Sequence, residues 1–216
     1  RPNSRAWSSG APVTTPYNNL PLWSIWGRSA TDIWATAALT AAGNVLHWNG
    51  QSWQQVSAQG GAEPAYTVVW GLPSAGPWIG AVTGALVQNT RGSWTLAPSV
   101  SKEILRGIWG SSENDVWVVG DNGAMLHWDG VEWRSYSEGV SNAWTAMWGS
   151  GPDDVWVGGL KGTLAHWDGV KFVSSAALGG TSSDIAAMHG SASNTIYLVG
   201  TKGLIAYYGG QNWAQQ

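Results

Sequence analysis

Short apolar runs alternate with turn-forming residues along the chain, and the pattern is clearest in its middle. Four apolar runs, separated by Gly- and Asx-rich segments, occupy residues 104–109, 116–119, 124–128 and 131–136. Asp129-Gly130 separates the last two runs, and Asp-Gly is a strong hairpin signal because a type I′ turn needs positive φ at both central residues. No segment has a sustained helical period. The pattern therefore predicts four consecutive β-strands.

The same unit recurs along the chain, and a Trp-Gly pair marks each copy. The pairs are Trp26-Gly27, Trp70-Gly71, Trp109-Gly110, Trp148-Gly149 and, in altered form, His189-Gly190. Eight residues after each pair comes a second aromatic residue, at Trp34, Trp78, Trp117, Trp156 and Tyr197. A polar-aromatic or double aromatic pair follows at His47-Trp48, His127-Trp128, His166-Trp167 and Tyr207-Tyr208, where the second copy has Gln88-Asn89. These shared landmarks establish five repeats.

Four strands in a repeat of about 40 residues are typical of the blades of a β-propeller. We therefore predict an all-β fold, a five-bladed β-propeller of four-stranded antiparallel blades. A two-sheet sandwich does not explain the fixed period, and a β-trefoil needs three copies. The predicted propeller spans residues 22–216, with blades at about 22–60, 61–101, 102–140, 141–180 and 181–216.

Residues 1–21 contain four prolines and are expected to form an extended N-terminal arm or a closing strand. The segment around Trp7 resembles the fourth strand around Trp133, but the fifth repeat already has a fourth strand near Trp213. Two strands therefore compete to close the ring. Either the arm wraps outside the ring or the chain is a fragment of a larger repeat protein. The first residue, Arg1, equally suggests a removed leader or a longer chain.

The consensus W-G-x-x-x-x-D-V-W-V-x-G-x-x-G-x-x-x-H-W-D-G-x-x-W resembles repeats of secreted or lipid-anchored bacterial propeller proteins, especially those of myxobacteria. The residues that carry the resemblance lie at 109–133 and 148–172, and it extends over about residues 22–213. It implies an extracytoplasmic location, whether secreted, periplasmic or surface-anchored. The blade count is similar to that of five-bladed tachylectin-2-type lectins, whose motif differs. Sialidase Asp-box repeats are similar too, but Trp128 follows Gly123 too distantly for that motif.

Composition excludes several classes of function. There are 10 Lys+Arg and 13 Asp+Glu, a formal net charge of −3 and no basic run, so nucleic-acid binding is not expected. No apolar stretch is long enough to cross a membrane as a helix. The absence of Cys excludes disulfides, thiolate metal sites and a cysteine nucleophile.

Most of the 18 Trp lie at repeat landmarks, which predicts packing between blades rather than ligand contacts. Trp23 and Arg106 occupy a variable position on the predicted innermost strands, three residues before the Trp-Gly pair. Innermost strands line the central channel of a propeller, so these two residues are our candidate ligand-binding residues. A solvated channel wall is the alternative explanation.

The remaining polar landmarks have structural explanations. His47, His127 and His166 fall at one repeat position, too far apart to share a metal, and each is expected to form a local hydrogen bond. Asp32, Asp115 and Asp154 are expected to cap the backbone of their own turns. No nucleophile motif or phosphate-binding loop is present. We therefore predict no catalytic residues, no metal site, no cofactor and no enzymatic activity.

Two functions remain open. We favour a lectin-like module that binds carbohydrate in clefts between blades, and the alternative is a scaffold or subunit for protein–protein interaction within a larger envelope or surface assembly. The expected partner is thus a glycan or a protein. Repeated equal sites would favour the lectin, whereas one continuous apolar patch would favour the scaffold. Blades 1 and 2 depart most from the consensus, so a single specific site would be expected near them, whereas five equal weak sites would act through avidity.

Overall fold

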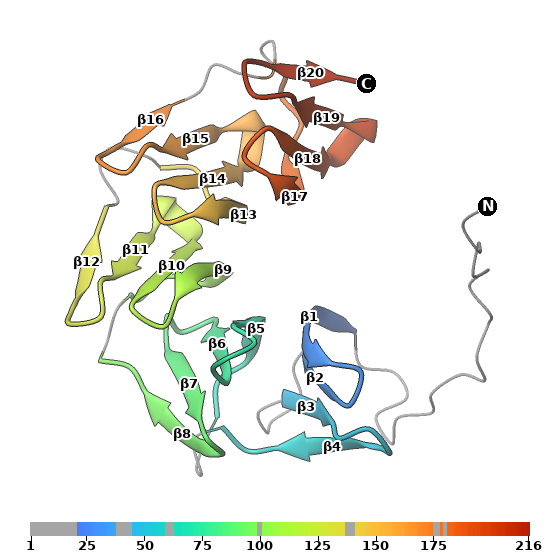
Figure 1. Cartoon of the computed structure of the whole chain (residues 1–216), viewed down its shortest axis with the longest axis vertical. Helices are drawn as coiled ribbons and strands as arrows, with labels where there is room; N and C mark the ends of the chain where they lie inside the picture. The colour runs from blue at the N-terminus through green and yellow to red at the C-terminus, as the bar shows by residue number, and fades with distance from the viewer. Residues whose placement is uncertain are drawn as a thin grey trace.

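The computed structural model describes residues 21–37, 45–58, 63–98, 101–136, 141–174, 178 and 181–216. Within these residues, twenty strands form five four-stranded antiparallel sheets, each built from one continuous stretch of sequence. The sheets are arranged around a common centre as propeller blades (Figure 1). The predicted fold class is confirmed. The predicted N-terminal arm, 1–21, lies outside the described residues except for Pro21.

Each blade is an up-and-down meander whose strands follow one another in sequence order. Blade 1 comprises β1 (Leu22–Ser29), β2 (Asp32–Ala37), β3 (Val45–Trp48) and β4 (Trp53–Val56). Blade 2 comprises β5 (Tyr66–Gly71), β6 (Pro77–Ala81), β7 (Leu86–Thr90) and β8 (Ser93–Leu96). Blade 3 comprises β9 (Leu105–Ser112), β10 (Asp115–Gly120), η1 (Asp121–Gly123), β11 (Met125–Trp128) and β12 (Trp133–Ser135).

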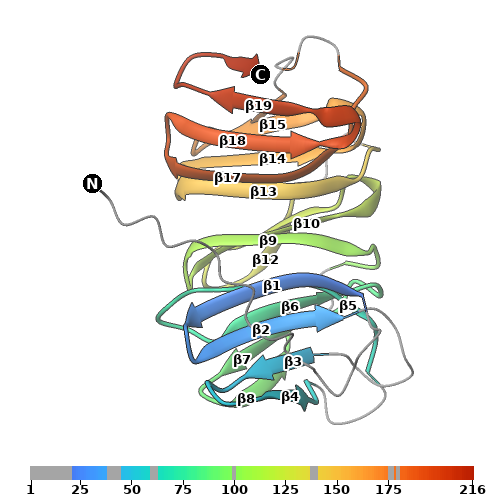
Figure 2. The same cartoon turned by 90° about the vertical axis from the view of Figure 1, so that its right-hand side faces the viewer.

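The last two blades repeat the architecture of blade 3, including its short 3-10 turn. Blade 4 comprises β13 (Trp144–Gly151), β14 (Asp154–Gly159), η2 (Leu160–Gly162), β15 (Leu164–Trp167) and β16 (Phe172–Ser174). Blade 5 comprises β17 (Ile185–Ala192), β18 (Thr195–Gly200), η3 (Thr201–Gly203), β19 (Ile205–Tyr208) and β20 (Trp213–Gln215). The innermost strands of successive blades contact each other, and Figure 2 shows β17, β13, β9 and β1 along the inner side.

The Trp-Gly pairs pack each blade against the next, because the Trp of one blade lies over the Gly of the following blade. The indole of Trp109 in blade 3 lies over Gly149 in blade 4, where an added Cβ would come within 2.6 Å of the ring. The same overlap joins Trp26 to Gly71, Trp70 to Gly110 and Trp148 to Gly190. Glycine is therefore needed because the neighbouring indole occupies the space of a side chain. The Trp-Gly repeat is thus a packing device between blades, as expected for these landmarks.

The turn between β11 and β12 differs from the type I′ turn predicted from the Asp-Gly pair. In blade 3, Gly130 has φ of 91° but Asp129 keeps an ordinary φ, so the predicted type I′ turn is wrong there. The Asp129 carboxylate instead accepts hydrogen bonds from the backbone N–H groups of Val131 and Glu132, both at 2.9 Å. A short acidic side chain therefore pairs the backbone N–H groups of the turn, and no second residue with positive φ is needed.

The five blades form an open arc rather than a closed ring. Blade 1 lies at one end of the arc and blade 5 at the other, and β17 does not return to β1 (Figure 1). Four blade–blade seams therefore exist within the described residues, between blades 1 and 2, 2 and 3, 3 and 4, and 4 and 5.

Candidate functional site

A stacked Trp-His-Asp unit fills the middle of three of the blades. In blade 3 the rings of Trp117 and His127 stack with centroids 4.0 Å apart, and His127 Nε2 lies 2.6 Å from Asp115 Oδ1. Blade 4 repeats the unit with Trp156, His166 and Asp154, at 4.2 Å and 2.6 Å. Blade 1 repeats it with Trp34, His47 and Asp32, at 4.0 Å and 2.9 Å.

The unit explains both polar landmarks of the repeat. The histidines form local hydrogen bonds, as predicted, but their partners are the recurring aspartates. The expectation that Asp32, Asp115 and Asp154 cap the backbone of their own turns is incomplete, because each also pairs with a histidine, and Asp115 additionally accepts a backbone hydrogen bond from Ser111 of its turn. A signal for the pairing was present in the sequence, because Asp and His occur together in repeats 1, 3 and 4 and are both absent from repeats 2 and 5.

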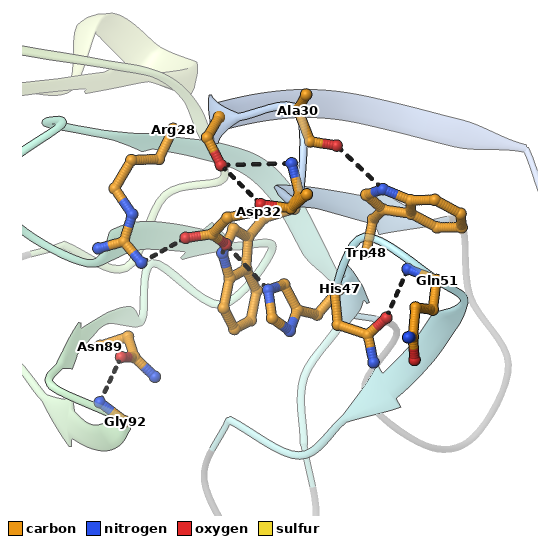
Figure 3. Close-up of polar contacts among 12 residues, drawn as sticks. Arg28, Ala30, Asp32, His47, Trp48, Gln51, Asn89 and Gly92 are labelled. Carbon is orange, nitrogen blue, oxygen red and sulfur yellow. Dashed lines mark hydrogen bonds and ion pairs between the residues drawn. The ribbon is translucent and has the colours of Figure 1, made fainter.

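At Asp115 and Asp32, hydrogen bonding outweighs burial in setting the pKa of the carboxyl group. Burial alone would raise the pKa of Asp115, but hydrogen bonds from His127 and Ser111 bring it below the usual value of 3.8. Burial likewise opposes a lowered pKa at Asp32, where hydrogen bonds from His47, Trp34 and Arg28 prevail. Figure 3 shows the Asp32 carboxylate between Arg28 and His47. These carboxylates are ionised structural partners of the rings.

Blade 2 lacks this unit, and its replacement residues are smaller. Gln88 stands opposite Trp78, at the register position that His127 occupies opposite Trp117. Gly76 stands two residues before Trp78, where the other blades have Asp, and an added Cβ there would lie 2.0 Å from the backbone oxygen of Asn89. The Asn89 backbone therefore occupies the space that the Cβ of an aspartate would need.

One further small residue opens the seam between blades 2 and 3. Ala97 and Tyr136 occupy the same repeat position, since the N–H of each donates to the third strand of its own blade, at Leu86 O and Met125 O. In blade 3 the Tyr136 ring packs against Trp117, with ring centroids 5.2 Å apart. The Ala97 methyl group cannot fill that space beside Trp78.

The result is a cleft of about 470 Å³, which we call the 2–3 cleft. Its lining residues come from blade 2 and blade 3: Trp78, Gln88, Thr95, Leu96, Ala97, Pro98, Trp128, Val131, Glu132 and Trp133. Three indoles form its wall, with Trp133 edge-on to Trp78 at 5.9 Å and tilted against Trp128 at 5.7 Å. The cleft is thus predominantly apolar, with Gln88 and Glu132 as the polar groups of its longer side chains.

The mouth of the 2–3 cleft carries exposed aliphatic side chains. Leu96 on blade 2 is 57% exposed and Val131 on blade 3 is 84% exposed. Glu132 Oε1 is held by Arg134 Nε at 2.9 Å, so its carboxylate already has a cationic partner at the rim. A patch of this composition favours an apolar ligand over a charged one.

The seam between blades 3 and 4 has a smaller cleft of about 370 Å³ with a different lining. It includes Tyr136 and Phe172 and is bordered by Lys171. The clefts between blades are therefore unequal, which argues against a set of identical sites.

Trp23 and Arg106, the residues proposed from sequence, both line a separate cavity of about 300 Å³ near the centre of the arc. Thr67, Val82, Ile104 and Thr145 complete its lining. The Arg106 guanidinium is engaged by Asp121, with Nη2 2.9 Å from Oδ2, and this hydrogen bond raises the pKa of Arg106. Their role in binding a ligand stays a prediction, and the sequence-based choice missed the 2–3 cleft.

The described residues contain neither a candidate metal-binding cluster nor a candidate membrane-spanning helix. No cluster of three or more His, Cys, Asp or Glu side chains there could hold a metal ion. No helix in that part of the chain has the length and apolar character needed to cross a membrane.

Comparison with known proteins establishes the fold. No family model matches the chain, and no curated protein matches its sequence. Among solved structures, YCF48 bound to a D1 peptide is similar, with a TM-score of 0.67 and 17% identity over 91% of this chain and 67% of that one. The designed protein Ika8 has a TM-score of 0.70 and 20% identity, covering 90% and 61%.

A third similar structure is the extracellular domain of the hybrid two-component system BT3049 from B. thetaiotaomicron. It has a TM-score of 0.70 and 14% identity, covering 92% of this chain and 30% of that one. The chain thus spans about two thirds or less of these three proteins. The neighbours are β-propellers, which agrees with the five four-stranded blades found here.

Proposed function

We propose that this propeller is a non-catalytic binding module that takes a short apolar segment of a partner protein in the 2–3 cleft. The observation that carries the proposal is the cleft itself, opened by Ala97 and Gln88 where blade 3 has Tyr136 and His127. Its volume lies within the range of about 300–1,000 Å³ typical of ligand sites. Blades 1, 3 and 4 keep the histidine that Gln88 replaces in blade 2, which favours one specific site over five equal ones.

The lining suits a peptide with bulky apolar side chains. Trp is enriched among the residues that dominate binding energy at protein interfaces, and three indoles converge here. Leu96 and Val131 supply exposed apolar surface at the mouth. The Gln88 amide has both a donor and an acceptor, so it can pair with the backbone of an extended peptide.

Carbohydrate binding is the second candidate, and it is favoured by one feature of the same cleft. The half-buried indoles of Trp128 and Trp133 stand beside the polar side chains of Gln88 and Glu132. Aromatic faces with nearby hydrogen-bonding groups suit a sugar ring. The unequal clefts of neighbouring seams count against the multivalent lectin expected from the repeat.

The comparisons add limited support to the peptide proposal. One similar propeller is described as bound to a peptide, and another is an extracellular domain. We extend the proposal to an extracytoplasmic location, which the second neighbour and the resemblance to secreted repeat proteins support. Neither comparison identifies a partner.

The test is selection from a phage-displayed library of random dodecapeptides on the immobilised chain. We expect enriched peptides rich in aromatic and aliphatic residues, whose binding is then measured by fluorescence polarisation. Ala97→Tyr places a ring where Tyr136 stands in blade 3 and should weaken binding at least about tenfold, equivalent to 1.4 kcal/mol. Circular dichroism would verify that the variant remains folded.

A matched pair of substitutions localises the contact. Val131→Ser at the mouth of the 2–3 cleft should weaken the selected peptides, whereas Val170→Ser, at the same repeat position in blade 4 and 81% exposed, should not. Failure to enrich any peptide, or equal affinity in Ala97→Tyr, would overturn the proposal. Glycan-array binding that Ala97→Tyr abolishes would establish the carbohydrate candidate instead.

A further inference from the structure

The two ends of the arc expose surfaces that every interior seam buries. On blade 5, Tyr197 is 52% exposed, whereas the residues at its repeat position, Trp34, Trp78, Trp117 and Trp156, are at most 8% exposed. On blade 1, Leu22 is 56% exposed, whereas Tyr66, Leu105, Trp144 and Ile185 are at most 2% exposed. Each end therefore presents one half of a blade–blade seam.

Further apolar side chains extend both end surfaces. Val199 and Ile205 of blade 5 are 44% and 47% exposed and lie opposite each other in the register of β18 and β19. Ile25 of blade 1 is 64% exposed. Apolar groups exposed together on a sheet face indicate a surface that another element covers.

Gly27 indicates which kind of element would fit the exposed face of blade 1. At the other four Trp-Gly positions, the indole of the preceding blade lies within 3.1 Å of the point where a Cβ would stand. At Gly27, the nearest atom to such a Cβ is Cγ1 of Ile33 in the same blade, at 3.3 Å, and no indole lies near it. Blade 1 thus has the glycine over which an indole packs in the other blades. Within the described residues, no indole packs over Gly27.

We propose that at least one further four-stranded blade of the same repeat, in the same polypeptide ahead of blade 1, packs on β1 and places a Trp over Gly27. The opening in the arc is narrower than the arc of the five blades (Figure 1). A second copy of the five blades, continued with the same curvature, would collide with blade 1. Additional blades of one chain fit the opening and cover both ends.

The proposal is independent of the function assigned to the 2–3 cleft. It predicts that the native polypeptide is larger than the 22.9 kDa of residues 1–216 by at least one repeat. Immunodetection of the native protein in its source, followed by intact-mass measurement, tests this directly. A native mass of 22.9 kDa would overturn the proposal.

A built extension tests the surface itself. A copy of residues 102–180, comprising blades 3 and 4, is joined ahead of β1 so that the second Trp148 can reach Gly27. We expect the melting temperature to rise by about 5 °C over that of residues 1–216 and the binding of a hydrophobic dye to fall. No rise in the melting temperature would overturn the proposal.

Glycine substitutions provide the matched controls. Gly27→Ala should leave the melting temperature of residues 1–216 nearly unchanged but cancel most of the gain in the extended chain. Gly149→Ala, which forces a Cβ to within 2.6 Å of Trp109, should lower the melting temperature of both. An equal effect of Gly27→Ala on the two chains would contradict the proposed packing of an indole over Gly27.

The oligomeric state distinguishes a further blade of the same polypeptide from a second copy of the chain as the element that covers the ends. Multi-angle light scattering should find residues 1–216 monomeric at micromolar concentration. A dimer that Ile25→Glu and Tyr197→Glu each abolish, and that forms again when the two variants are mixed, would mean that a second copy covers the ends. That result would overturn the proposal in favour of head-to-tail association.

Discussion

Blades 2 and 3 have the same four-strand meander, but side chains fill the centre of blade 3 more completely than that of blade 2. Blade 3 fills its centre with Trp117, the His127-Asp115 pair and Tyr136, and Trp117 is fully buried. In blade 2, Gln88 and Ala97 replace the histidine and the tyrosine, and Trp78 borders the 2–3 cleft. The comparison shows that a repeat in which packing groups are replaced by smaller residues leaves a larger cleft at its seam. Backbone pairing between strands holds the blade together while its side chains change.

The largest effect should follow removal of the buried indole in the filled blade. Trp117→Ala should lower the free energy of unfolding by about 3–5 kcal/mol, because it leaves a cavity among Tyr136, Trp167 and Phe172. Trp78→Ala should cost less, because Trp78 already borders the cleft on one side. Urea denaturation of both variants measures the difference, and equal losses would contradict the contrast between the two blades.

The next effect tests why blade 2 has no aspartate at its second landmark. Gly76→Ala should destabilise the fold by about 1–3 kcal/mol, since the added Cβ collides with the Asn89 carbonyl oxygen. Gly151→Ala is the control, because an added Cβ there meets nothing within 4 Å and should change stability by less than about 0.5 kcal/mol. A neutral Gly76→Ala would show that backbone approach does not exclude the aspartate.

A pH-dependent effect should distinguish the blade with the Asp-His pair. The folded-state pKa of Asp115 lies below its unfolded value, so its stabilisation is complete above the unfolded pKa near 3.8 and is lost as the pH falls through the folded pKa. Asp115→Asn should therefore cost about 1–2 kcal/mol at pH 7 and progressively less in that acidic range.

Denaturation at pH 7 and pH 3 measures this change. Asp115→Asn combined with His127→Gln, which copies the glutamine of blade 2, should cost less than the sum of the two single variants, because one hydrogen bond joins the two residues. A cost of Asp115→Asn that is independent of pH would refute the ionised pair.

The smallest effect on stability should come from refilling the cleft. Ala97→Tyr should raise the free energy of unfolding by at most about 1 kcal/mol, since its ring enters existing space beside Trp78. The substitution would make blade 2 resemble blade 3 while removing ligand binding. A strongly destabilised Ala97→Tyr would mean that the seam cannot accept a ring, and the two blades would then differ in backbone as well as side chains.

Much of the architecture was accessible from spacing alone. The five Trp-Gly positions and the apolar runs between them predicted the blades, and the packing role of these Trp residues follows from their recurrence. The pairing of Asp115 with His127 was missed, although their shared absence from repeat 2 was visible. The 2–3 cleft could not be derived, because it depends on how Ala97, Gln88 and two neighbouring blades meet across a seam.

The sequence by itself determined the repeat, the strand order within each blade and the positions that pack. Those properties depend on local alternation and on turns between neighbouring strands, which a linear pattern records. The tertiary structure alone decided which seam is open, which carboxylate each histidine meets and that the blades form an arc with bare ends. These depend on volumes and distances between residues of different strands and blades, and residue order along the chain does not specify them.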